Sequence, residues 1–244
     1  MGIRLALTAF VVSVVGAGVA RATTVFIRFD PGYSTLVTVD RTVNGGANWY
    51  MQDPGQFHFL TQPGSPADVP LSFYTFCIEP REFLTPGQFV SYDLVPVEQG
   101  ATNIGGMGAT KANVVRELLG RYYPDFSIEV DDRTGAAIQV ALWEIIRENV
   151  QTIGSYDLAT GDVRYRTWSD PAVETLATTM LSSLTGTGPM VSVSGVQALT
   201  LVGTQDTLVQ LTTGGFGSTP EPATLFLMGA GLVAVGLLGR RKKA

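Results

Sequence analysis

The chain has 244 residues, with 16 Lys and Arg against 21 Asp and Glu. Setting aside the terminal segments 1–22 and 214–244 removes six basic residues and one acidic residue, so the body between them keeps 10 basic and 20 acidic residues. A net charge near −10 argues against nucleic acid and anionic lipid as partners of the body, because both reward clustered Lys and Arg. The one cysteine, Cys77, excludes an intramolecular disulfide.

The first 22 residues have the pattern of a signal peptide. Arg4 precedes an apolar run over 5–19, and Ala20-Arg21-Ala22 supplies the small residues of a signal-peptidase site. The apolar run is too short to span a membrane stably. We therefore expect signal peptidase to cleave after Ala22 and the body to be exported.

From residue 24 to residue 97 the chain favours β-structure. Runs rich in Val, Thr, Phe and Tyr alternate with Gly, Pro, Asn and Asp, which is the pattern of strands joined by turns. The expected strands are 24–29, 35–43, 56–61, 71–78 and 89–97.

Cys77 lies in the fourth of these runs, which is apolar on both faces when read with a period of two. Such a strand belongs in a core rather than at a solvated edge. On alternation, Cys77 shares its side with Phe73 and Thr75, and Phe76 and Ile78 point the other way. We expect a sheltered thiol. An unpaired exported cysteine is either a reactive group, an intermolecular bridge or a small inert core residue.

Three helices are expected in the middle of the chain, over 109–123, 135–149 and 171–184. The third begins with Asp170 as its N-cap and Pro171 at its first position. After it, strands 191–201 and 207–212 form a closing pair. We therefore expect one β-rich body over 23–213 with inserted helices, a mainly β fold of the α+β class, followed by a Gly, Ser and Thr tether over 214–219.

The second helix separates apolar from charged side chains on a helical wheel. The apolar arc holds Ile138, Leu142, Trp143, Ile145 and Ile146, and the opposite arc holds Glu144, Arg147 and Glu148. Gln139 falls inside the apolar arc. A buried amide costs free energy unless something bonds to it, so Gln139 needs a partner.

A sheltered thiol and a buried carboxamide are the two halves of an internal thioester. The sulfur of Cys77 would attack the side-chain carbonyl of Gln139, and ammonia would leave. Two groups held in attack geometry reach effective molarities on the order of 10⁵ M or more. In the alternative, Cys77 is a packed core residue and Gln139 bonds to backbone groups.

These residues resemble the thioester domains of bacterial surface adhesins over roughly 70–150. Phe76-Cys77-Ile78-Glu79 is similar to the cysteine motif of that family, and residues 138–143 are similar to its glutamine motif. The resemblance implies that Cys77 and Gln139 form the bond without a cofactor and that an amine or hydroxyl on a surface protein or polysaccharide accepts the acyl group. It implies an adhesion module rather than a turnover enzyme. Ile138 stands where the family has Thr, and Glu79 stands where it has Asp.

The C-terminal segment 220–244 has three parts in a fixed order. Pro220-Glu221-Pro222 precedes an apolar stretch over 223–239, and Arg240 and Arg241 open a basic tail. At about 1.5 Å per residue the stretch forms a helix of about 25 Å, long enough for a thin membrane. The positive-inside rule keeps the tail cytoplasmic and the body outside.

This order resembles the PEP-CTERM sorting signal of Gram-negative bacteria. The resemblance implies that an exosortase recognises the signal, cuts near it and passes the body to the cell envelope, the outer surface or the extracellular matrix. The alternative is a plain membrane anchor, which leaves the paired prolines unexplained. A structural protein of the matrix or biofilm, without covalent chemistry, is the second functional candidate.

The sequence contains few of the residue patterns that conventional enzyme sites require. The lone histidine, His58, has no second histidine for a zinc site, and neither His-Glu-x-x-His nor Gly-x-Ser-x-Gly occurs. Paired carboxylates among Glu129, Asp131 and Asp132 are an alternative that spacing leaves open. A carbohydrate platform is another, and its aromatic candidates are Trp49, Tyr50, Tyr165 and Trp168.

Overall fold

The computed structural model describes residues 23–30, 37–43, 45–46, 48–84, 86–150, 152–187, 193 and 195–212. These residues belong to one compact unit, Ala22–Phe216. The predicted signal peptide, tether, transmembrane helix and basic tail lie outside the described residues. Within the described ranges, no helix combines the length and apolar character that a membrane crossing requires.

The larger sheet has six antiparallel strands in the order β5-β4-β1-β6-β8-β9. Its strands are β1 (Thr23–Phe29), β4 (Phe57–Thr61), β5 (Ser72–Thr75), β6 (Val90–Pro96), β8 (Val196–Thr200) and β9 (Thr207–Gln210). Just beyond β5, an isolated antiparallel bridge joins Cys77 to Thr207 of β9. The two ends of the strand order therefore meet, and the edge of β5 is covered where the cysteine lies.

A small antiparallel sheet has the order β3-β2-β7. It consists of β2 (Val39–Thr42), β3 (Tyr50–Gln52) and β7 (Arg164–Arg166). Neither β3 nor β7 was expected from the sequence, because three residues are too few to show an alternating pattern. These strands form through pairing with β2, which is a tertiary effect.

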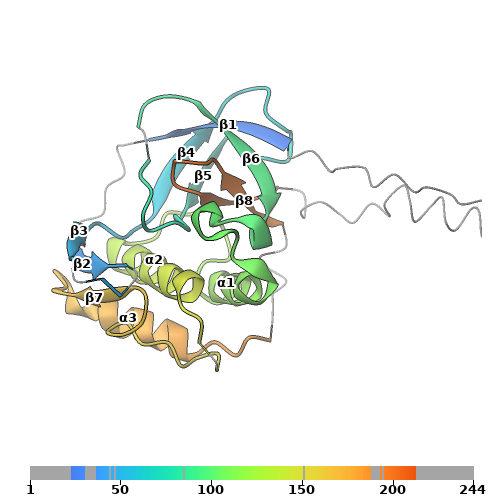
Figure 1. Cartoon of the computed structure of the whole chain (residues 1–244). Helices are drawn as coiled ribbons and strands as arrows, with labels where there is room; N and C mark the ends of the chain where they lie inside the picture. Colours follow the sequence, from blue (N-terminus) through green and yellow to red (C-terminus); the bar gives the residue numbers. More distant parts are fainter. Residues whose placement is uncertain are drawn as a thin grey trace, which may run out of the picture. The chain divides into compact units, whose positions relative to one another are not determined.

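The α-helices are α1 (Gly108–Tyr122), α2 (Asp132–Arg147) and α3 (Pro171–Ser182), preceded by the 3₁₀ helices η1 (Val97–Gln99) and η2 (Thr102–Ile104). The side chain of Asp131 caps α2 by accepting a hydrogen bond from the Thr134 N–H, and Asp170 caps α3. The three α-helices lie side by side and face the larger sheet (Figure 1). The mainly β fold with inserted helices is confirmed.

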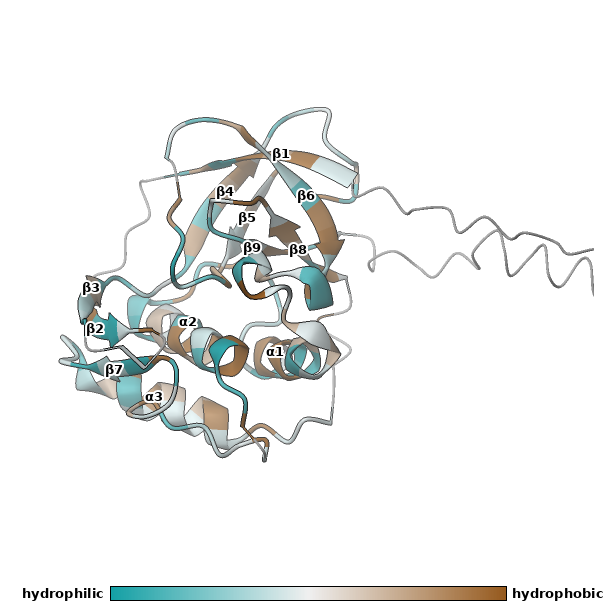
Figure 2. Ribbon diagram, in the orientation of Figure 1, coloured by the Kyte–Doolittle hydropathy of each residue, from teal (hydrophilic) through white to brown (hydrophobic). Residues whose placement is uncertain are grey.

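Two hydrophobic clusters occupy the two sides of the strands. Val25, Ile27 and Phe73 belong to a cluster built from the strands themselves. Phe76 and Ile78 belong to the larger cluster, which contains the apolar residues of the helices. Hydrophobic residues recur along β6, β8, α1 and α2 (Figure 2). The expected alternation is thus confirmed for Phe73 against Phe76 and Ile78, although the strand ends at Thr75.

The charged arc of α2 is buried at Glu144, which is only 1% exposed. The segment after the helix folds back over that arc. The Asp157 N–H donates to Glu144 Oε1 at 3.2 Å, and Arg147 pairs with Asp162 at 2.7 Å. Because α2 is covered on every side from Gly135 to Ile146, its wheel shows only which face carries charge in that part of the helix.

Candidate functional site

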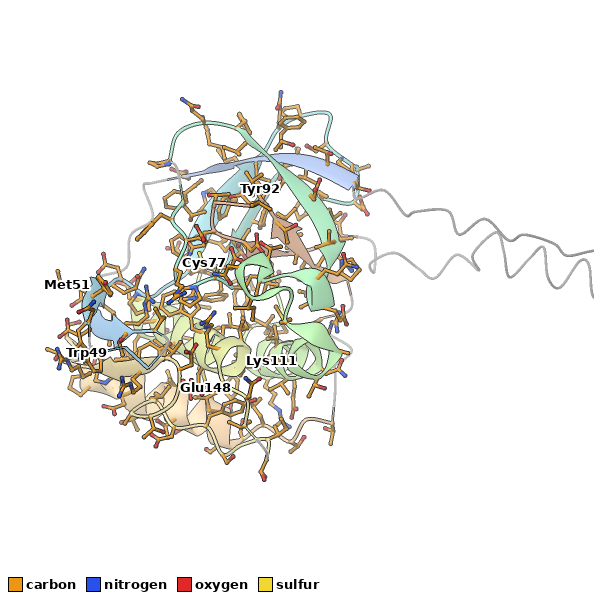
Figure 3. The ribbon with its side chains drawn as sticks, in the orientation of Figure 1. Trp49, Met51, Cys77, Tyr92, Lys111 and Glu148 are labelled. Atoms are coloured by element: carbon orange, nitrogen blue, oxygen red, sulfur yellow. The ribbon has the colours of Figure 1, made fainter. Side chains whose placement is uncertain are left out.

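Cys77 is fully buried between the strand layer and the helical layer (Figure 3). The sheltered thiol is confirmed, and its shelter comes from long-range contacts. At the end of β5, the Thr75 hydroxyl donates to the Leu208 carbonyl at 2.6 Å, and beyond it the Ile78 N–H donates to the Asp206 carbonyl at 3.0 Å. These bonds hold the cysteine segment against β9 and the turn before it.

Gln139 lies on α2, is fully buried and meets Cys77 directly. Its Nε2 donates to the Cys77 carbonyl at 2.7 Å, and its Oε1 accepts from the Cys77 N–H at 2.9 Å. One turn earlier, a Cβ on Gly135 would lie 3.4 Å from the backbone N of Gln56. The small residue therefore lets α2 approach the chain that leads into β4. The carboxamide is held against the backbone of the residue that carries the thiol.

The two hydrogen bonds have two chemical consequences. They satisfy the buried amide, as the packing alternative requires. They also polarise the side-chain carbonyl, because the Cys77 N–H is aimed at the oxygen that would gain negative charge if a nucleophile attacked the carbon. Since Ile138 supplies no hydroxyl, the backbone of Cys77 orients the glutamine.

The surroundings of Cys77 favour the neutral thiol. Burial, followed by the charges of Glu79 and Asp206, raises the pKa of the Cys77 thiol well above its ordinary value. A thiolate is the stronger nucleophile, so any reaction here has to move the thiol proton during the attack. The same environment keeps water away from whatever bond is formed.

A buried carboxyl pair, Glu79 and Asp206, lies next to this segment. Glu79 is 1% exposed and Asp206 is fully buried. Glu79 accepts hydrogen bonds from the N–H groups of Asn103 at 2.7 Å and Asp206 at 3.0 Å, and Asp206 accepts from the Thr102 N–H at 2.8 Å. Burial raises the pKa of Glu79 to about 7. Sequence reasoning missed this pair, whose only signal was Glu79 at a motif position.

The three carboxyls considered as a hydrolytic pair are arranged differently from a catalytic centre. Glu129, Asp131 and Asp132 are exposed, and Asp131 serves as the cap of α2. Within the described ranges, no group of three or more His, Cys, Asp or Glu side chains is placed to hold a metal ion. His58 is hydrogen-bonded to Asp30 and Ser72.

The four aromatic candidates do not share one surface. Arg166 lies over the ring of Trp49 at 3.9 Å, at the outer end of the small sheet (Figure 3). Tyr165, next to Arg166 on β7, is only 5% exposed and packs on Trp168 with ring centroids 5.7 Å apart. Because neighbouring strand residues point to opposite faces, the ring of Trp49 lies on the other side of β7 from the rings of Tyr165 and Trp168.

The comparisons with known proteins concern the C-terminal segment. A family model of the PEP-CTERM protein-sorting motif matches residues 218–242, which include Pro220, Glu221, Pro222, Arg240 and Arg241. The motif is the recognition signal for exosortase and marks proteins exported to the cell envelope or surface of Gram-negative bacteria. The predicted sorting signal is confirmed. No curated protein and no solved structure matches the chain significantly.

Proposed function

We propose that the exported body is an adhesion module in which Cys77 and Gln139 close an internal thioester. The observation that carries the proposal is the pair of hydrogen bonds between the Gln139 carboxamide and the Cys77 backbone, at 2.7 and 2.9 Å. The two residues are 62 positions apart in the chain. Their contact is therefore a product of the fold and not of local sequence.

The bond-forming step is an acyl transfer within the protein. The sulfur of Cys77 attacks the side-chain carbonyl carbon of Gln139, and the Cys77 N–H stabilises the oxyanion that forms. The C–N bond then breaks, and the amide nitrogen leaves as ammonia with the proton of the thiol. The products are one thioester and one ammonia, so no oxidant or cofactor is needed.

The second step attaches the body to a partner. A primary amine or a hydroxyl on a surface protein or polysaccharide attacks the thioester carbonyl, and the Cys77 thiol leaves with the proton of the nucleophile. The sorting signal supports this assignment, because exosortase processing delivers the body to the cell envelope or surface, where such partners are found. Each thioester reacts once, so this attachment chemistry involves no turnover.

A structural protein of the extracellular matrix or biofilm is the second candidate. Two observations favour it. The Gln139 amide is already satisfied by backbone groups, and burial together with Glu79 and Asp206 raises the thiol pKa. In this case Cys77 and Gln139 stabilise the junction between β5 and α2 without reacting.

Intact mass spectrometry of the natively purified body separates the two functions. A thioester lowers the mass by one ammonia relative to the sequence, and methylamine then adds its full mass at Gln139. The Gln139→Ala and Cys77→Ala variants lose both signals, whereas Gln62→Ala, at an exposed glutamine, keeps them. If the measured mass equals the sequence value and Cys77 is fully alkylated after unfolding, the body belongs to the structural class.

A further inference from the structure

Three polar side chains lie together on the outer side of β4 and β5, away from the Cys77 site. His58 of β4 has its Nε2 2.7 Å from Ser72 Oγ and its Nδ1 3.3 Å from Asp30 Oδ2. Asp30 directly follows β1, and Ser72 opens β5. Because β5, β4 and β1 are neighbours in the larger sheet (Figure 1), strand pairing alone brings the three residues together.

The surrounding contacts fix the imidazole and leave the hydroxyl accessible. The His58 ring packs on Tyr74, its cross-strand partner, with ring centroids 4.8 Å apart, and its side chain is 11% exposed. The Asp30 N–H donates to the His58 carbonyl at 2.9 Å, which keeps the carboxylate beside the ring. Ser72 is exposed to solvent. The carboxylate therefore holds one ring nitrogen, and the other faces an accessible hydroxyl.

A serine, a histidine and an aspartate in this order form the arrangement that activates a serine nucleophile. The imidazole nitrogen next to the hydroxyl accepts its proton, and the carboxylate holds the tautomer in which that nitrogen is free to accept. Such a set is recognised by geometry and roles, and not by sequence position. The three residues carry none of the motifs by which a serine hydrolase is found in sequence.

We propose that Ser72 and His58, positioned by Asp30, cleave carboxylic esters of small acyl groups presented at the protein surface. Ser72 Oγ attacks the ester carbonyl, and its proton passes to His58 Nε2. The alcohol leaves with that proton, and an acyl group stays on Ser72. Water then attacks the acyl carbon and gives its proton to His58, which passes that proton to Ser72 Oγ as the carboxylic acid leaves.

The exposed position of Ser72 sets the substrate class. A nucleophile on an open strand reaches short acyl groups on accessible molecules, because no deep cleft is needed to admit them. A general base held at hydrogen-bond distance contributes typically about 10²–10⁴-fold to such a reaction. We expect activity at the lower end of that range, near 10²-fold above a variant without the nucleophile.

Two probes test the site on the purified body. A fluorophosphonate, followed by peptide mapping, reports which serine is activated, and hydrolysis of p-nitrophenyl acetate reports turnover. Ser127 is the matched control, because it is exposed and its hydroxyl donates to Asp125 at 2.7 Å, with a carboxylate in place of an imidazole. The expected label is on Ser72, with about a 100-fold loss of hydrolysis in Ser72→Ala and no loss in Ser127→Ala.

The remaining variants assign the roles. His58→Gln abolishes labelling of Ser72 while the unfolding midpoint shows that the protein is folded. Asp30→Asn lowers the rate and changes its pH profile, since the carboxylate sets the tautomer of His58; a merely structural role leaves that profile unchanged. Equal labelling of Ser72 and Ser127, or hydrolysis by Ser72→Ala at the wild-type rate, overturns the proposal. A label mapped to Ser72 keeps this result separate from the thioester, whose reactive residues are Cys77 and Gln139.

Discussion

The body holds two candidate nucleophiles in opposite surroundings. Cys77 is fully buried between the two layers, and its partner Gln139 is equally buried. Ser72 is exposed at the start of β5, and its partner His58 is held by a carboxylate. A dry site preserves an activated acyl group once it forms, whereas a wet site lets water remove it. Burial therefore decides whether such chemistry ends in one lasting bond or in repeated hydrolysis.

The largest expected difference between the two regions is in the free energy of unfolding. Gln139→Met keeps the length of the side chain but leaves the Cys77 N–H and carbonyl without their hydrogen bonds. An unsatisfied buried group costs about 1–3 kcal/mol, so we expect the free energy of unfolding to fall by about 3 kcal/mol in urea denaturation. Ser72→Ala, on the exposed side, is the control and changes it by less than about 0.5 kcal/mol. Equal effects of the two variants would contradict the buried, fully bonded environment of Cys77.

A smaller effect comes from the carboxyl beside the cysteine. The pKa of Glu79 is raised to about 7, above the roughly 4.3 of an unfolded glutamate. Protonated Glu79 therefore favours the folded state, and this contribution is complete below about pH 4 and is lost as the pH rises through about 7. We expect Glu79→Gln to flatten the decline in stability between pH 5 and pH 8, by on the order of 2 kcal/mol at pH 8.

Urea denaturation across this pH range measures the change. Glu129→Gln, at an exposed carboxyl in the chain before α2, provides the reference profile. A decline that persists unchanged in Glu79→Gln would assign the pH dependence to other groups.

The smallest expected loss of stability comes from removing a hydrogen bond at the solvent-exposed surface. Asp131 is exposed and caps α2 through the Thr134 N–H at 3.1 Å. Asp131→Ala removes that bond from the helix that carries Gln139, and loss of an N-cap costs about 1 kcal/mol. Thermal unfolding followed by circular dichroism checks this value. The neighbouring Asp132→Ala serves as the control, and a loss as large as that of Gln139→Met would show that exposed and buried bonds contribute equally.

Local sequence patterns predicted most of the framework. The alternating runs located β1, β4 and β6, and the cap Asp170 located the start of α3. The patterns failed for β3 and β7, which are too short to show a period, and they did not indicate that the charged arc of α2 is buried at Glu144. The loop that covers this arc comes later in the chain, so the sequence of the helix contains no pattern that indicates it.

The residues of the candidate sites also differ in whether the sequence indicated them. Cys77 and Gln139 stood out because each was unusual where it occurred, one as an unpaired exported thiol and the other as an amide on an apolar arc. Asp206, by contrast, looked like an ordinary turn residue, and Asp30, His58 and Ser72 matched no motif. Their partners come from other strands, so no spacing within one segment indicates them.

The sequence by itself determined how this protein is sorted, because the signal at 218–242 works through the order and composition of a short continuous segment. It also determined the mainly β character of the body and the identity of its one thiol. Only the tertiary structure decided what that thiol meets. Hydrogen bonds between residues 62 positions apart, and a triad collected from three paired strands, depend on how elements pack, and packing is a property of the whole chain.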